Sequence, residues 1–73
     1  MKFLSADEIK YYKKTFKPKT RVRMLSMFAE NYPVPYGTCG TVWCVDDLGT
    51  IHVEWDNGQT LGICPNVDKF EKI

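Results

Sequence analysis

The sequence predicts a mainly β domain with one N-terminal helix, in which the strands form a small SH3-like antiparallel barrel of about five strands. Three features predict it: a helix-start motif at Ser5, short alternating segments separated by turn residues, and an Asn57-Gly58 dipeptide between two of those segments. The 73 residues suit a single domain, with the helix over 6–16 and the barrel over 20–73.

The helix begins at a capping box, Ser5-Ala6-Asp7-Glu8. The Ser5 hydroxyl is expected to accept from the Glu8 amide, while the Glu8 carboxylate accepts from the Ser5 amide. An apolar stripe follows at helical spacing and consists of Ile9, Tyr12 and Phe16. Pro18 cannot continue a helix, so the helix is expected to end before it.

The strands are short and bounded by turn residues. They are expected over residues 21–24, 38–45, 50–55, 59–63 and 70–73. Residues 28–37 should form an irregular loop, because Pro33 and Pro35 exclude a central strand there. Asp46–Gly49 forms the first tight turn and Asn57-Gly58 the second.

The first turn also predicts which side chains share a face. A tight turn at 46–49 pairs Val45 with Thr50 and Cys44 with Ile51, which places His52 opposite Trp43. The inward-facing row is then Val42, Cys44, Ile51, Val53 and Trp55. Trp43 and His52 form an outward cross-strand pair, which we interpret as a contact hot spot. The alternative is that the apolar stripe of the helix covers Trp43.

Several motifs carry a resemblance to a known family. They are Pro18-x-Thr20-Arg21-Val22, Gly37-Thr38-x-Gly40-Thr41-Val42, Val45-Asp46-Asp47-x-Gly49-x-Ile51-His52-Val53-x-Trp55-Asp56-Asn57-Gly58 and Pro65-x-Val67-Asp68-x-Phe70. Over about residues 15–73 the chain resembles the bacterial family called domain of unknown function 4314, which is common in Gram-positive bacteria and their mobile elements. The resemblance implies the SH3-like fold and no catalytic residues. Lys19 stands where this pattern leads us to expect glycine.

Charge is separated along the chain. Residues 1–23 hold eight basic residues against two acids, a net charge of +6, whereas residues 24–73 hold two against seven, a net charge of −5. Such polarity indicates an acidic partner, including nucleic acid. Two alternatives stay open: the acidic part of the domain neutralises the basic part internally, or the lysines form a solvated helix face.

The three cysteines and the single histidine sum to a Cys₃His zinc set, but their spacing argues against one site. Cys39 and Cys44 lie on one expected strand, about 17 Å apart at ~3.4 Å per residue. We therefore expect no metal site and no other cofactor, with a smaller zinc site from Cys64 and His52 as the alternative. The odd cysteine count and the lack of a secretion signal in this sequence predict reduced thiols.

These observations predict a non-catalytic module that binds another protein, since no nucleophile, base and orienting group share a recognisable motif. The expected contact residues are Tyr32, Tyr36, Trp43 and His52. The link to mobile elements makes a host or phage protein, such as a defence nuclease that the module binds or inhibits, the expected partner.

The alternative is a nucleic-acid-binding barrel that uses Lys10, Lys13, Lys14, Lys17, Lys19, Arg21 and Arg23. A membrane partner is not expected, because no apolar run approaches the ~20 residues of a membrane span. The N-terminus also lacks the apolar stretch of a signal peptide, which predicts a cytoplasmic protein.

Overall fold

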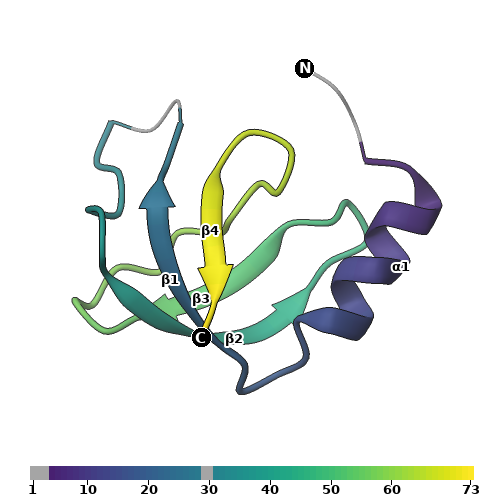
Figure 1. The fold of residues 1–73 in the computed structure, drawn as a ribbon, viewed down its shortest axis with the longest axis horizontal. Coiled ribbons are helices and arrows are strands. Elements are labelled where there is room, and N and C mark those ends of the chain that lie inside the picture. The colour runs from purple at the N-terminus through teal and green to yellow at the C-terminus, as the bar shows by residue number, and fades with distance from the viewer. Residues whose placement is uncertain (1–3, 29–30) are drawn as a thin grey trace.

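The structure is a computed structural model and describes residues 4–28 and 31–73. The described residues form one helix and four strands: α1 (Ala6–Thr15), β1 (Arg21–Ser26), β2 (Cys39–Val45), β3 (Ile51–Trp55) and β4 (Lys69–Lys72) (Figure 1). The prediction of a mainly β domain with one N-terminal helix is confirmed. The helix ends one residue earlier than expected, because Phe16 caps it and its amide donates to the Tyr12 carbonyl at 2.8 Å.

The four strands form one antiparallel sheet in the order β3-β2-β1-β4. Among the described residues this sheet does not close into a barrel. The strand expected over 59–63 is reduced to a single bridge between Ile51 and Ile63. Continuing that ladder would pair Val53 with Leu61, but the Leu61 carbonyl accepts instead from the indole Nε1 of Trp55 at 2.8 Å. A side-chain donor thus bonds the carbonyl that the Val53 amide would bond if the ladder continued.

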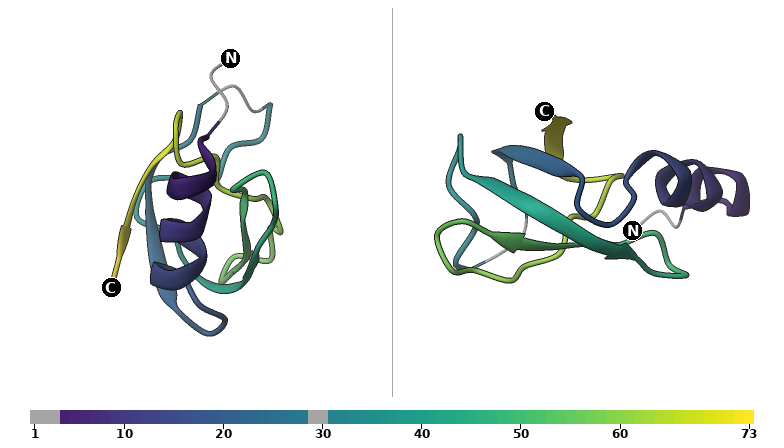
Figure 2. Two further views of the ribbon diagram at one scale, coloured as in Figure 1. Left: turned by 90° about the vertical axis from the view of Figure 1, so that its right-hand side faces the viewer. Right: turned by 90° about the horizontal axis from the view of Figure 1, so that it is seen from below.

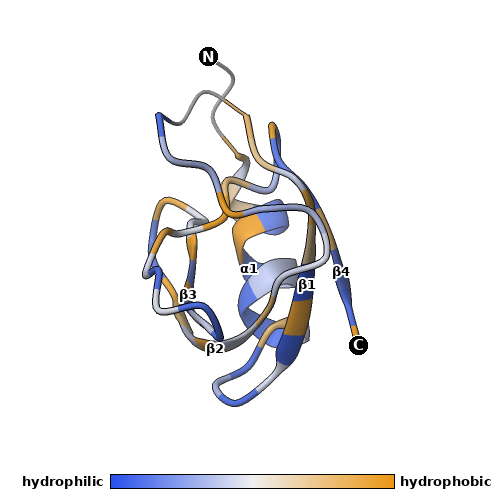
Figure 3. Ribbon diagram, turned by 90° about the vertical axis from the view of Figure 1, so that its left-hand side faces the viewer, coloured by the Kyte–Doolittle hydropathy of each residue, from blue (hydrophilic) through white to orange (hydrophobic). Residues whose placement is uncertain are grey.

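The core lies on the concave side of the sheet. Apolar residues alternate with hydrophilic ones along β1, as Figure 3 shows. The buried hydrophobic residues are Phe16, Val22, Met24, Val34, Val42, Ile51, Val53, Trp55 and Ile63. Val34 comes from the loop between β1 and β2, so part of this loop closes the core while its neighbours stay exposed.

Helix α1 lies across one end of the curved sheet, between β4 and the β2–β3 hairpin (Figure 2). Phe16 packs edge-on against Phe70, with ring centroids 5.5 Å apart. At the other end of the helix, a Cβ built on Gly49 would collide with Leu4, which shows how closely Leu4 approaches the β2–β3 turn. The predicted capping box is present, with the Glu8 amide 3.1 Å from the Ser5 hydroxyl and the Ser5 amide 2.9 Å from the Glu8 carboxylate.

The register of the β2–β3 hairpin differs from the predicted one. Val45 pairs with Ile51 and Cys44 with His52, and a β-bulge at Trp43 restores the expected Val42–Val53 pair. Cys44 therefore shares a face with His52 rather than with the inward row, and Val45 packs against the core in its place. The extra residue arises because the turn runs from Asp46 to Thr50 and includes one more residue than a 46–49 turn.

Candidate interaction surface

The bulge at Trp43 positions the most prominent exposed aromatic residue of the sheet. In a bulge, two residues of one strand oppose one residue of the other, and here Trp43 and Cys44 both oppose His52. Trp43 is 54% exposed, so α1 does not cover it. Its ring centroid lies 5.2 Å from that of His52, which confirms the predicted contact between the two side chains. The backbone partner of His52 is Cys44, the residue after Trp43.

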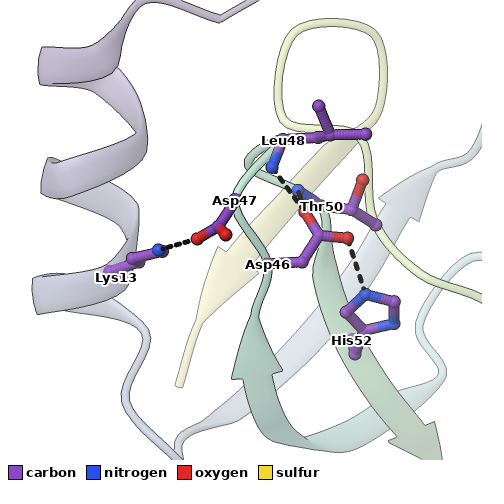
Figure 4. Close-up of polar contacts among 6 residues, drawn as sticks. All are labelled: Lys13, Asp46, Asp47, Leu48, Thr50 and His52. Carbon is purple, nitrogen blue, oxygen red and sulfur yellow. Dashed lines mark hydrogen bonds and ion pairs between the residues drawn. The ribbon is translucent and has the colours of Figure 1, made fainter.

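His52 is held in place by Asp46, which sits at the end of β2 (Figure 4). The His52 Nε2 atom lies 2.9 Å from Asp46 Oδ2, and because an ionised carboxylate only accepts, this nitrogen donates. The other oxygen of Asp46 accepts from the amides of Leu48 and Thr50 at 2.9 and 3.0 Å. One carboxylate thus fixes both the turn and the ring against which Trp43 packs.

These contacts change the acidity of Asp46. Partial burial raises the pKa of the carboxyl, but the hydrogen bonds from His52 and from the Thr50 and Leu48 amides outweigh it. The pKa of Asp46 therefore lies below its ordinary value of 3.8, and the group stays ionised at neutral pH.

On the other side of Trp43 lies the connection between α1 and β1. The Lys19 amide donates to the Val42 carbonyl at 2.7 Å, and the Val42 amide donates to the Thr20 carbonyl at 2.8 Å. Lys19 has φ +77°, the left-handed conformation that glycine adopts most readily, which agrees with the glycine expected at this position. The turn carrying Lys17 and Lys19 therefore runs directly beside the residue that precedes Trp43. We call Trp43, His52 and Lys17–Lys19 the Trp43 surface.

Tyr32 and Tyr36 are 81% and 79% exposed but do not belong to this surface. They lie on the loop that enters β2 at Cys39, and Trp43 is four residues further along the strand, about 13 Å at ~3.3 Å per residue. The loop is tied to the fold by the Gln59 side chain, which donates to the Tyr32 carbonyl at 3.0 Å. The structure thus separates the four predicted contact residues into two pairs at opposite ends of β2.

The seven predicted nucleic-acid contacts also fall into two groups. Three of them form ion pairs with acids of the β part: Lys13 with Asp47, Arg21 with Asp56 and Arg23 with Glu71. The hydrogen bonds from Arg21 hold the pKa of Asp56 below its ordinary value. The remaining four are exposed and have no ion pair with the described residues: Lys10, Lys14, Lys17 and Lys19. Internal neutralisation therefore accounts for part of the charge separation.

Comparison with known proteins identifies the family of the chain. A family model described as "Domain of unknown function (DUF4314)" matches residues 5–73. The chain belongs to this family. No curated protein and no solved structure matches it.

In this DUF4314 member the cysteines do not form a recognisable reactive site. Cys39, Cys44 and Cys64 are all partly exposed, and no two of them are joined by a disulfide. Among the described residues, no group of three or more His, Cys, Asp or Glu side chains is placed to hold a metal ion. Of the alternative zinc pair, Cys64 and His52, the His52 Nε2 atom bonds to Asp46 at 2.9 Å, and Cys64 is partly exposed. Within the described chain, no helix has the length and apolar character to cross a membrane.

The sequence pattern does not predict the contacts of two residues near Trp43 in this DUF4314 member. The pattern places Asp46 only in the turn and Cys44 in the core. A signal for Asp46 exists, since an Asp that begins a turn commonly accepts from amides two or more residues later. The position of Cys44 depends on the bulge, which alternation of polar and apolar residues does not reveal.

Proposed function

We propose that this domain is a non-catalytic module that binds another protein, with Trp43 at the centre of the contact. The observation that carries the proposal is the bulge, which places an exposed indole on the sheet and against a histidine that Asp46 holds. Exposed tryptophans on rigid supports are typical hot spots, because a large apolar area is buried on binding at little cost in conformational entropy.

The surroundings of Trp43 support a binding role. The ring that packs against the indole belongs to His52, a polar residue bonded to Asp46, and polar residues beside an aromatic anchor are usual at a transient protein interface. The family's association with mobile elements favours a host or phage protein, such as a defence nuclease, as the partner. This last step is an analogy at the level of the family.

A nucleic-acid ligand is supported less well. Three of the seven proposed contacts already bind acids of the same chain. Binding to phosphates is favoured by a face that carries a single sign of charge, whereas Asp47 and Asp56 lie among these cations.

Quantitative affinity capture with variant baits tests the proposal. Trp43→Ala is the test bait, and Leu48→Ala is the matched control, because Leu48 is 72% exposed on the adjacent turn. Both substitutions should change the free energy of unfolding by less than about 0.5 kcal/mol, as is usual at exposed positions. We expect a protein captured by the wild type and by Leu48→Ala to be lost with Trp43→Ala. If every captured protein is retained by Trp43→Ala, the proposal is wrong.

A further inference from the structure

We infer that the protein partner presents carboxylates to the lysines that border Trp43. This inference rests on the proposed function and specifies the chemistry of the partner at the same surface. It is based on which basic residues form ion pairs within the chain and which are exposed without an ion pair.

The lysines outside ion pairs are grouped. Lys10 and Lys14 are exposed and lie one helical turn apart on α1, about 6 Å along the axis at 1.5 Å per residue. Lys17 and Lys19 follow in the turn between α1 and β1 and are also exposed. We call these four lysines of α1 and the turn after it the basic border, and none of them has an acidic partner among the described residues.

Lys17 and Lys19 belong both to this border and to the Trp43 surface, and backbone bonds join their turn to β2. The Thr20 amide donates to the Lys17 carbonyl at 3.0 Å and so closes the turn, and the Lys19 amide bonds to Val42. The β2 backbone at Val42 and Trp43 consequently lies between β3, which carries His52, and the turn that carries Lys17 and Lys19. We expect a partner that buries the indole to come within reach of the long side chains of these two lysines.

The mixed charge around Trp43 favours a protein over a nucleic acid. Asp47, the partner of Lys13, lies in the β2–β3 turn, and Glu54 is exposed on β3 two residues after His52. A polyphosphate would meet these acids as well as the lysines, whereas a folded protein can place carboxylates opposite the lysines alone. Charge complementarity of this kind sets the rate of association and selects the partner more than it adds affinity.

Titration of the isotope-labelled full chain with two defined probes tests the inference. The probes are a glutamate 16-mer and a thymidylate 16-mer, each followed by NMR at low and moderate salt. The glutamate probe should shift the amides of Lys10, Lys14, Lys17 and Lys19 and the indole of Trp43. The indole of Trp55 serves as an internal reference, because this side chain is buried and bonded to Leu61. Binding should weaken about tenfold as salt rises, since exposed charges are screened.

Two charge variants sharpen the test. Lys14→Glu with Lys17→Glu should abolish the glutamate-induced shifts. Lys69→Glu is the matched control: Lys69 is exposed on β4, outside the basic border, and its substitution should reduce the affinity less than twofold. Tighter binding of the thymidylate probe at equal salt, or equal losses in the two variants, would overturn the inference.

The same variants separate this inference from the proposed function. Used as capture baits, Lys14→Glu with Lys17→Glu should lose the proteins that depend on Trp43, and Lys69→Glu should retain them. If those proteins are lost with Trp43→Ala but retained with Lys14→Glu and Lys17→Glu, the carboxylate inference fails while the proposed function stands. If Trp43→Ala loses nothing, the proposed function fails.

Discussion

His52 Nε2 lies 2.9 Å from Asp46 Oδ2, and this contact joins the outer face of the sheet to the turn on which the helix docks. The neighbouring residue, Asp47, binds Lys13 of α1, so two consecutive carboxylates face opposite directions (Figure 4). Asp46 orients the ring beside Trp43, and Asp47 pairs with the helix that carries Lys10 and Lys14 of the basic border. The geometry of the Trp43 surface thus depends on one short turn.

The two oxygens of Asp46 have separable roles. In Asp46→Asn the carbonyl oxygen can still accept from the Leu48 and Thr50 amides, but the new amide group cannot accept from His52. We expect this variant to lose about 1 kcal/mol of unfolding free energy and Asp46→Ala to lose about 2 kcal/mol, because the second variant also removes the turn bonds. Urea denaturation measures both, and equal losses in the two variants would contradict the division of roles.

The lowered pKa of Asp46 predicts how stability depends on pH. A carboxyl whose pKa is lower in the folded state stabilises the fold above its ordinary pKa of 3.8, and this contribution is lost as the pH falls through the folded-state value. Wild-type unfolding free energy should therefore fall on acidification below about pH 4. Asp46→Asn should show a shallower decrease, with a residual decrease from Asp56, whose pKa is also lowered. Parallel pH curves for the two proteins would show that Asp46 does not contribute.

Lys19 should be replaceable by glycine with a gain in stability. Its φ of +77° is unfavourable for a residue with a Cβ, and glycine adopts this conformation without that cost. After the larger entropy loss of glycine is subtracted, Lys19→Gly should raise the unfolding free energy by about 0.5–1 kcal/mol. Lys19→Ala is the control, because it removes the charge but keeps the Cβ and should not stabilise the protein.

Alanine substitutions at Gly49 and Gly58 distinguish the cost of backbone strain from the cost of a packing collision. Both have positive φ, +90° and +95°, but a Cβ on Gly58 meets nothing within 4 Å, whereas one on Gly49 would collide with Leu4 and lie 3.2 Å from Ile9. Gly58→Ala should therefore cost about 1 kcal/mol, from strain alone. Gly49→Ala should cost at least about 2 kcal/mol and loosen the start of α1. Hydrogen exchange of the α1 amides checks the second effect, which should be absent in Gly58→Ala.

The sequence predicts those features that depend on neighbouring residues. The capping box at Ser5 and Glu8 and the turn at Asn57-Gly58 are determined within a few residues, and both are present. The bulge at Trp43 is not visible in the sequence, because alternation gives the face of each residue only while the register is unbroken. The missing fifth strand is likewise not visible, because alternation does not indicate that the Trp55 indole bonds the Leu61 carbonyl six residues later.

The sequence also predicts one part of the candidate site and not another. The contact of Trp43 with His52 follows from the approximate pairing of two strands, and it survives a shift of one residue because both rings are large. The separation of Tyr32 and Tyr36 from that pair is not predictable in this way. They flank Val34, whose burial in the core is a tertiary contact that the local sequence does not indicate.

The ion pairs between the basic and acidic parts have a consequence before the chain folds. They join residues 34, 35 and 48 positions apart, and all three link the first 23 residues to the later acidic part. In the unfolded chain these oppositely charged segments attract each other within a screening length of about 10 Å at moderate salt. The denatured ensemble should therefore be more compact in dilute buffer than in concentrated salt, and the ends of the future sheet should meet more often before any strand has formed.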